Sequence, residues 1–191
     1  MPLFTSLNLT YRSHTPSHAS FIHTASLSSP EGYSYSSNTL PRPQNPADAE
    51  KPLAKMAESL LAVMVCLPPP SSAPITEPVP IGDLTLEASP KTRHHRTCSL
   101  GIIIVPSYQG KGYGSEAILW ALDGAPGSAN MHSVRIAAFG YNEGATRLYD
   151  QLGFVREGSM REALWWEGRW WDRVLWSMLE EEEGHWIVEA Q

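Results

Sequence analysis

Apolar runs of strand length recur along the chain and predict a sheet. The run Pro80–Ala88 alternates, with Ile81, Leu84 and Leu86 as its apolar members, and is expected to be a half-buried strand. The run Cys98–Val105 is almost continuously apolar, which indicates a largely buried strand near the centre of a sheet. Further strands are predicted for three other runs: Leu7–Ser13, Leu60–Leu67 and Ser133–Phe139.

Segments with helical spacing separate these runs. Ragged helical patterns cover residues 14–27 and 47–60, and regularly spaced apolar residues predict a helix from Ser115 to Leu122. The stretch 123–130 contains two glycines and a proline, so we expect it to stop that helix abruptly near Leu122.

The last third of the chain has clear local signals. A helix is predicted over Glu143–Leu152, with Asn142 as its N-cap and Gly153 in the left-handed conformation that ends it. Residues 154–179 contain two strand patterns around the turn Glu167-Gly168, which is typical of a hairpin.

The expected order of elements is therefore β-α-α-β-β-β-loop-α-β-α-β-β. This is an α/β fold in the broad sense and α+β in the strict sense, with a mixed, mostly antiparallel sheet of about seven strands flanked by about four helices. We expect residues 1–179 to form a single domain with a long Ser- and Pro-rich surface loop at 28–46. Residues 180–191 are expected to be an acidic C-terminal tail.

Composition narrows the class of protein. A net charge of −6 without a basic stripe argues against nucleic acid as a partner. No run reaches the roughly 18 apolar residues that a membrane span needs, so no membrane partner is expected. The seven histidines show no ligand spacing, and the pair His94-His95 is expected to be a surface feature, so no metal site is predicted.

Cysteine content and the N-terminus bear on location. Two cysteines, Cys66 and Cys98, fit reduced thiols and hence a cytoplasmic protein, with a nuclear location also open. The first thirty residues contain Arg12, no Asp or Glu and many Ser and Thr. That composition is a weak hint of a mitochondrial transit peptide, weak because one arginine is few for such a segment.

A glycine-rich stretch, QGKGYGS at 109–115, lies between the apolar run ending at Val105 and the predicted helix. A strand that enters such a loop and then a helix exposes free amide groups and the positive end of the helix dipole, which bind anions. Glycines allow a diphosphate to come close to the backbone, and Gln109 and Lys111 are candidate donors at the rim.

Three other interpretations of this loop were weighed. A P-loop needs Ser or Thr after Gly-Lys, where this chain has Gly112. A dinucleotide fingerprint needs G-x-G-x-x-G and an acidic ribose partner, and neither is present. A plain tight turn with positive φ stays open, although three alternate glycines are more than a turn requires.

Two blocks in order resemble the GNAT superfamily of N-acetyltransferases. The stretch VPSYQGKGYGSEAI resembles its acyl-CoA-binding motif, with Gln109, Gly112 and Gly114 at the named positions. The stretch FGYNEGATRLYDQLGF at 139–154 resembles its downstream motif N-x-x-A-x-x-L-Y-x-x-x-G-F. The last hairpin is similar to that of the branch that acetylates ribosomal proteins and small amines. The resemblance is sharp over residues 99–179.

The resemblance implies acetyl-CoA as co-substrate and no metal. Backbone groups of the strand end would pair with the pantetheine arm, and loop amides would hold the pyrophosphate. Asn142 would both cap its helix and contact the cofactor arm. The cofactor-binding residues so implied are Ile103, Ile104, Val105, Gln109, Gly110, Lys111, Gly112, Tyr113, Gly114, Ser115 and Asn142.

The same resemblance makes Tyr149 the catalytic candidate, as the acid that protonates the leaving CoA thiolate. A purely structural role is the alternative, because Tyr149 shares an apolar helix stripe with Leu152. Many relatives have a glutamate as general base where this chain has Ser99. The base therefore stays open, with Glu87, His94 and His95 as candidates by position in the chain, and a water chain or an already neutral amine would also suffice.

The implied function is transfer of an acetyl group from acetyl-CoA to a primary amine of a peptide, protein or small molecule, that is, an acyltransferase of the GNAT type. A non-catalytic acyl-CoA-binding module of the same fold is the alternative, favoured by Ser99 and by the early end expected for the helix after the loop. A nucleotide-binding protein is a third hypothesis, which the missing Ser or Thr after Gly-Lys disfavours. Five tryptophans in 165–176 suggest core, an aromatic acceptor pocket or a dimer face, so a monomer or a homodimer is expected.

Overall fold

The structure is a computed structural model, and it describes residues 4–15, 18, 21, 35, 56–69 and 77–185. The chain divides into two compact units. The first consists of Met1–Glu87 and Gly101–Trp120, and the second of Ala88–Leu100 and Ala121–Gln191. One strand and one helix contribute residues to both units.

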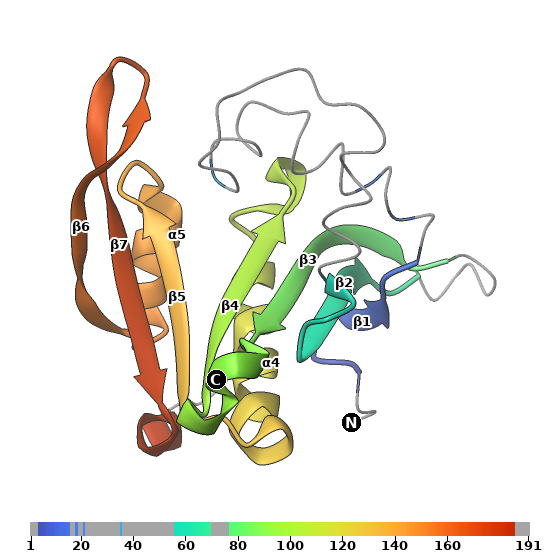
Figure 1. Cartoon of the computed structure of the whole chain (residues 1–191). Helices are drawn as coiled ribbons and strands as arrows, with labels where there is room; N and C mark the ends of the chain where they lie inside the picture. Colours follow the sequence, from blue (N-terminus) through green and yellow to red (C-terminus); the bar gives the residue numbers. More distant parts are fainter. Residues whose placement is uncertain are drawn as a thin grey trace. The chain divides into compact units, whose positions relative to one another are not determined.

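Seven strands form one sheet in the order β1-β2-β3-β4-β5-β7-β6 (Figure 1). The pair β4 and β5 is parallel, whereas the pairs β1·β2, β2·β3, β5·β7 and β6·β7 are antiparallel. The mixed, mostly antiparallel seven-stranded sheet expected from the sequence is thus confirmed. The helices expected over residues 14–27 and 47–60 and the loop at 28–46 lie largely outside the described residues.

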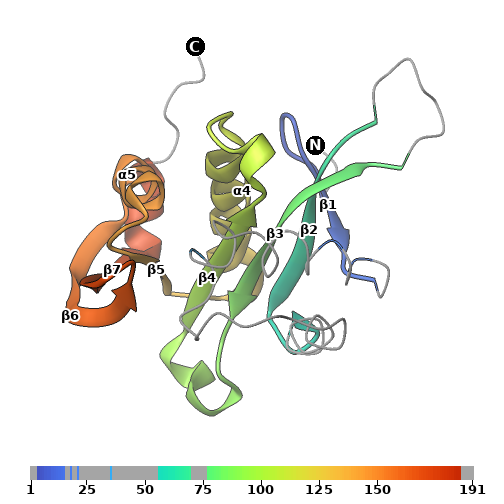
Figure 2. The same ribbon diagram turned by 90° about the horizontal axis from the view of Figure 1, so that it is seen from above.

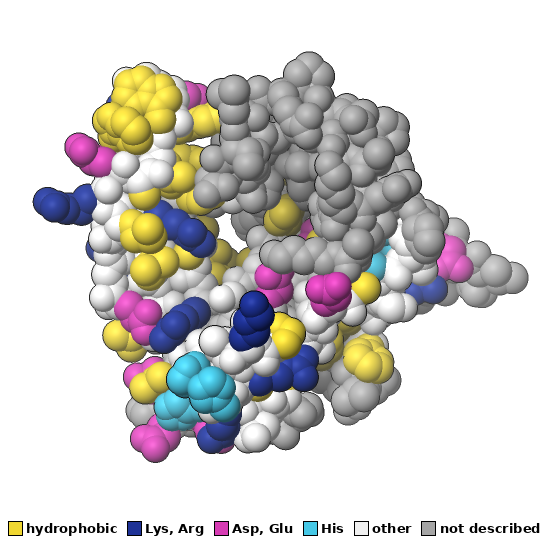
Figure 3. Space-filling view, viewed as in Figure 1, with side chains coloured by type: hydrophobic (Ala, Val, Ile, Leu, Met, Phe, Trp, Pro, Cys, Tyr) yellow, Lys and Arg dark blue, Asp and Glu magenta, His cyan; other side chains and the backbone are white. Residues whose placement is uncertain are grey.

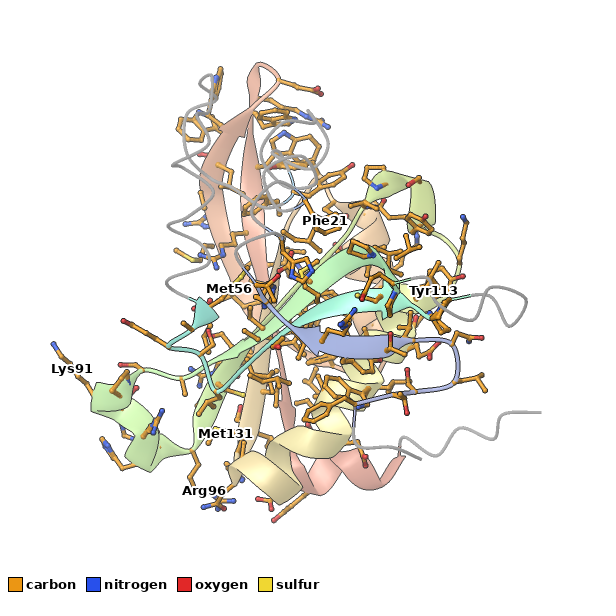
Figure 4. The ribbon with its side chains drawn as sticks, turned by 90° about the vertical axis from the view of Figure 1, so that its right-hand side faces the viewer. Phe21, Met56, Lys91, Arg96, Tyr113 and Met131 are labelled. Atoms are coloured by element: carbon orange, nitrogen blue, oxygen red, sulfur yellow. The ribbon has the colours of Figure 1, made fainter. Side chains whose placement is uncertain are left out.

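The first unit contains three antiparallel strands: β1 (Thr10–Ser13), β2 (Leu61–Leu67) and β3 (Val79–Glu87). Figure 4 shows these strands running across the view. It labels Met56, which precedes β2 in the chain, and Tyr113, the first residue of helix α4 (Tyr113–Ala129). The predicted first strand is shorter than expected, because pairing begins only at Thr10.

Burial along β3 differs from the expectation. Every residue from Ile81 to Leu86 is buried, so the strand is not half-buried. The alternation of apolar and polar residues in β3 comes from Asp83 and Thr85, whose side chains are polar but only 5% and 7% exposed. An alternating pattern predicts a solvent face only where nothing covers that face.

Strand β4 (Thr97–Ile104) shows the opposite deviation. It lies fourth in the sheet, as expected of a central strand. Ser99 and Gly101 are nevertheless exposed while Cys98 and Leu100 are buried, so the strand is not largely buried. The continuous apolar run Ile102–Ile104 is only half-buried.

A close backbone approach joins β3 to the end of β4. A Cβ atom added at Gly82 would lie 2.1 Å from the carbonyl oxygen of Ile103, so only glycine fits. Just beyond, the Val105 N–H donates to the Ile81 carbonyl at 2.9 Å. A β-bulge shifts the β2·β3 register here, between Val65 and Cys66.

The first turn of α4 (Tyr113–Ala129) is tied to the N-terminal strand. The Glu116 carboxylate accepts hydrogen bonds from the Ser6 hydroxyl at 2.5 Å and from the backbone N–H of Asn8 at 2.6 Å. Tyr11 stacks on Trp120 of the helix with ring centroids 3.6 Å apart. These contacts fix the start of α4 within the first unit.

The prediction that this helix ends near Leu122 is wrong. Helix α4 continues for 17 residues, and the chain turns at Asn130, whose φ is 54°. Helix propensity is a weak preference, with a cost of about 1 kcal/mol for a glycine such as Gly124. The buried apolar stripe of Ala117, Ile118, Ala121 and Leu122 lies in the predicted part, and the last turns continue from it past Gly124 and Pro126 to Ala129.

The second unit is built around β5 (Ser133–Phe139). Strand β5 pairs in parallel with Thr97–Ser99 of β4 and along its whole length with β7 (Arg169–Leu179). Val134, Ile136 and Ala138 are buried as predicted. In this unit β4 follows the 3₁₀ helix η3 (Pro90–His95).

The predicted C-terminal hairpin is confirmed. Strand β6 (Val155–Trp166) returns to β7 through Glu167 and Gly168, whose φ values are 50° and 78°. Two successive positive φ values are those of a type I′ turn, which joins the two strands of the predicted hairpin. The part of the expected acidic tail that is described, Glu180–His185, is a 3₁₀ helix, and its Glu180 accepts from Arg96 at 3.0 Å.

Helix α5 (Glu143–Gln151) lies along one face of β5, β7 and β6 (Figures 1 and 2). Its contact with the sheet centres on Trp176 of β7, which is 1% exposed. The Trp176 indole donates to the Asp150 carboxylate at 2.8 Å, so the buried N–H has a partner. None of the helices in the described ranges has the length and apolar character that a membrane span requires.

We predict that Gly82→Ala destabilises the fold, because the added methyl group would meet the Ile103 carbonyl oxygen at 2.1 Å. Backbone atoms cannot swing aside as a flexible side chain does, so we expect the free energy of unfolding to fall by about 2–3 kcal/mol. Urea denaturation followed by tryptophan fluorescence measures this change.

Gly124→Ala in α4 is the matched control. A Cβ atom there meets nothing within 4 Å. Alanine also favours the helix by up to about 1 kcal/mol. Equal denaturation midpoints for the two variants would contradict the close approach at Gly82.

Candidate functional site

The glycine-rich loop is formed as a short 3₁₀ turn, η4 (Pro106–Tyr108), followed by two glycines in the left-handed region. Gly110 has φ 71° and Gly112 has φ 83°. The positive-φ turn thus accounts for two of the three glycines, while Gly114 already lies in the first turn of α4. A Cβ atom at Gly110 or Gly112 would meet nothing within 4 Å. The space in front of this backbone is therefore open, as an anion site requires.

The loop holds its own polar side chains. The Gln109 side-chain amide donates to the Ile104 carbonyl at 2.7 Å, which ties the loop to the end of β4. The Lys111 ammonium donates to the Ser107 carbonyl at 2.8 Å and lies 5.1 Å from the Tyr108 ring centroid. Both side chains are exposed, so each stays available to an approaching anion.

The end of β4 has few free backbone groups. Val105 uses its N–H on Ile81 and its carbonyl on the Tyr108 N–H, both at 2.9 Å. The Ile104 carbonyl already accepts from Gln109. Neighbouring residues in a strand direct their amides to opposite edges, so the Ile104 N–H points away from β3. A ligand strand would therefore find Ile104 more open than Val105.

In the second unit, Asn142 begins α5 as predicted. Its side-chain oxygen accepts from the Ala145 N–H at 3.1 Å, and its carbonyl accepts from the Thr146 N–H at 3.1 Å. The end of α5 also follows the prediction, since Gly153 has φ 76°. The site residues predicted from sequence thus fall into two groups: those of the loop in the first unit, and Asn142 with Tyr149 in the second.

Tyr149 lies in an aromatic environment. It is 6% exposed, and its ring meets Trp176 edge-on at 5.5 Å between centroids and Phe154 at 6.1 Å. Burial raises the pKa of Tyr149 to about 12, so the phenol keeps its proton at neutral pH. The position suits both a proton donor and a core side chain.

The candidate bases lie in different places. Ser99 is exposed, and His94 and His95 are exposed on η3 with their rings 3.9 Å apart. Glu87 is half-buried at the end of β3. Within the described ranges, no three His, Cys, Asp or Glu side chains form a group that could hold a metal ion.

Sequence reasoning missed Asp83. This carboxyl lies in the middle of β3, and burial raises its pKa from 3.8 to about 7. The signal was an aspartate between apolar residues of a strand, but the alternating pattern assigned it to a solvent face. A carboxyl with a pKa near neutrality exchanges protons readily at physiological pH.

Hydrophobic side chains gather at the tip of the β6–β7 hairpin (Figure 3). Trp165 and Trp170 are 60% and 55% exposed and meet edge-on at 5.2 Å. Beside them, the Arg169 guanidinium lies 3.5 Å from the Trp171 ring centroid. The tryptophans thus divide between core, with Trp176, and an exposed aromatic tip.

Comparison with known proteins agrees with this architecture. The family model of the GNAT acetyltransferase domain matches residues 8–155. A GNAT-family acetyltransferase from Bacillus anthracis superposes with a TM-score of 0.74 at 21% identity, covering 94% of this chain and 99% of that one. The chain therefore belongs to the GNAT acetyltransferase family.

Spermidine acetyltransferases are among its relatives. The spermidine N-acetyltransferase of Vibrio cholerae, solved with CoA and spermine, superposes with a TM-score of 0.74 at 25% identity, over 92% of this chain and 98% of that one. In sequence, 66 residues (35% of this chain) are 38% identical to the Vibrio cholerae spermidine N(1)-acetyltransferase and 36% identical to that of Escherichia coli K12. These matches span 38% and 36% of the relatives' lengths.

We predict that Asn142→Ala lowers the free energy of unfolding by about 1 kcal/mol, because the Ala145 N–H at the start of α5 loses its acceptor. Asn142→Asp keeps an acceptor oxygen and should stay near the wild-type value. Chemical denaturation of the three proteins measures the difference. If Asn142→Ala unfolds at the wild-type midpoint, the cap does not contribute as the geometry indicates.

Proposed function

We propose that this protein transfers an acetyl group from acetyl-CoA to a primary amine of a peptide, protein or small molecule. The observation that supports the proposal most strongly is the loop of Gly110 and Gly112. It leaves open space in front of left-handed backbone at the start of a 17-residue helix. Membership of the GNAT family adds the chemistry that such a loop serves.

The cofactor would be held mainly by backbone. Amides from Gly110 to Ser115 would bind the pyrophosphate, with the rim donors Gln109 and Lys111 beside them. Pairing with the pantetheine arm would fall on Ile104 more than on Val105, whose own backbone groups are used within the fold, or on Ile103, whose carbonyl lies against Gly82 of β3. Asn142, as N-cap of α5, would be a further contact.

The chemistry would be direct. The amine nitrogen attacks the thioester carbonyl, a C–N bond forms, and the C–S bond breaks to release CoA thiolate. Tyr149 would supply the proton that converts the thiolate to the thiol. Its burial supports the role in one respect, because the phenol is fully protonated at neutral pH.

A non-catalytic acyl-CoA-binding module is the second candidate. One argument for it, the early end of the helix after the loop, no longer applies, since α4 extends to Ala129. The remaining argument is Ser99, which stands where many relatives have a glutamate that acts as the general base.

The acceptor is proposed to be a cationic amine. The relatives from Vibrio cholerae and Escherichia coli are named spermidine acetyltransferases, and one was solved with spermine. The net charge of −6 of this chain suits a cationic acceptor. We also propose that residues 1–179 act as one acetyltransferase domain in the cytoplasm, as a monomer or homodimer.

An acceptor screen tests the function. Purified protein with acetyl-CoA is offered spermidine, spermine, a peptide with a free α-amino group and a lysine peptide with a blocked N-terminus, and CoA release is read by thiol detection. We expect release that depends on at least one amine. Binding of CoA in calorimetry without release by any amine would favour the non-catalytic module.

Tyr149→Phe tests the acid. We expect kcat to fall by about 100-fold or more, because a positioned acid contributes about that much. Binding of CoA and the denaturation midpoint should stay near wild type, since no hydrogen bond of the phenol occurs among the described residues. An unchanged kcat would assign Tyr149 to the core alone.

A further inference from the structure

A buried carboxyl without a partner lies in β3. Asp83 is 5% exposed, and within the described part of the chain its side chain forms no hydrogen bond or ion pair. Burying a carboxylate alone costs several kcal/mol or drives the group to its neutral form, so buried carboxyls are normally paired. A cationic ligand is the partner that such a group lacks.

Strand register gives the face on which Asp83 lies. Asp83 pairs with Met64, and Met64 pairs with Arg12, so these three side chains form one row across the sheet. The neighbour of Arg12, Tyr11, points to the opposite face, where it stacks on Trp120 of α4. Asp83 therefore lies on the face of these strands that α4 does not cover.

Two glycines, Gly101 of β4 and Gly82 of β3, let neighbouring groups pack closely beside Asp83. Thr85 shares the face with Asp83, and a Cβ atom at Gly101 of β4 would lie 2.9 Å from the Thr85 hydroxyl. Gly82, next to Asp83, admits the Ile103 carbonyl at close range. Asp83 is thus on the strand adjacent to the end of β4, along which the pantetheine arm is proposed to lie.

Among the described residues, few charged groups share this face with Asp83. On β3 the same face carries Glu87, four residues away; on β2 it carries the buried thiol of Cys66. On β1 it carries Arg12, which is ion-paired with Glu77. Desolvation alone accounts for the raised pKa of Asp83.

His14 and His18, just beyond β1, are further titratable groups of this region among the described residues, with ring centroids 6.5 Å apart. Both ring nitrogens of His14 are buried, and the backbone of Ala62 is the polar group with which the ring interacts. Desolvation lowers the pKa of both imidazoles, which disfavours their charged forms.

We propose that Asp83 is the general base that receives the acceptor ammonium and takes its proton. This assignment rests on the proposed acetyltransferase function and fills the role left open by Ser99. Asp83 accepts one proton from R–NH₃⁺, and the free amine then attacks the thioester carbonyl. A second proton leaves the nitrogen as the amide forms and balances the one that the CoA thiolate receives. Asp83 returns its proton to solvent after the amide product leaves.

Asp83→Asn is the test, because it keeps the shape and removes the base. With spermidine and each amine that scores in the screen, we expect kcat/KM at pH 7 to fall by about 100-fold or more. The deficit should shrink as the pH approaches the amine pKa of about 10, where the free amine is abundant. Binding of CoA in calorimetry should change less than twofold. Asp123→Asn, on the exposed side of α4, is the matched control and should keep the wild-type rate.

Stability against pH gives a readout that is independent of turnover. The unfolded chain releases the Asp83 proton near pH 4, and the folded chain releases it near pH 7. Between these values the folded state binds the extra proton, so the contribution of this group to stability falls as pH rises and is constant above pH 7. Asp83→Asn should therefore gain in denaturation midpoint over wild type from pH 4 to 7.

Each result decides the assignment. Wild-type rates for Asp83→Asn across the pH range, a parallel loss of CoA binding, or the same pH trend in stability as wild type would overturn it. A loss in Glu87→Gln without one in Asp83→Asn would move the base to Glu87. Wild-type protein that binds CoA but acetylates no amine overturns the proposed function and this base with it. Transfer that persists in Asp83→Asn overturns the base alone.

Discussion

The close approach of β3 to the end of β4 is the constraint on which the first unit depends. At Gly82 the two backbones come so near that a single methyl group would overlap the Ile103 carbonyl. One residue earlier, Ile81 accepts from Val105 and so fixes where β4 ends. The glycine-rich loop starts from that fixed point. Asp83, the next residue along β3, is buried, and β4 beside it carries no charged residue.

The anion-binding character of the loop depends on which of its backbone hydrogen-bonding groups are already paired. Val105 and Ile104 use their carbonyls within the turn, on Tyr108 and on the Gln109 side chain. The amides at the start of α4 have no intrahelical partners, because no residue precedes them in the helix. Two left-handed glycines present those amides to open space. Anion binding here therefore depends on backbone geometry more than on Lys111, which is held against the Ser107 carbonyl.

Features set by local sequence were predicted well, and features set by tertiary packing were not. The Asn142 cap, the Gly153 end of α5 and the Glu167-Gly168 turn need only neighbouring residues, and all three are present. Helix α4 continues beyond Leu122 through Gly124 and Pro126, so local stop signals do not set its length. The same holds for Asp83, because a period-2 pattern shows which residues share a face and does not show whether that face is covered.

Burial acts in opposite ways on the two residues proposed for proton transfer. Burial raises the pKa of the Asp83 carboxyl from 3.8 to about 7, which is where a base is most effective near neutral pH. Burial raises the pKa of the Tyr149 phenol to about 12, which makes its proton harder to donate. A thiol such as that of CoA has an ordinary pKa of about 8.5, so transfer of the phenol proton to free thiolate is uphill. If both assignments hold, removal of the ammonium proton is the step for which this fold is better tuned. Tyr149 would still supply its proton to the departing sulfur, at a higher free-energy cost than an exposed phenol.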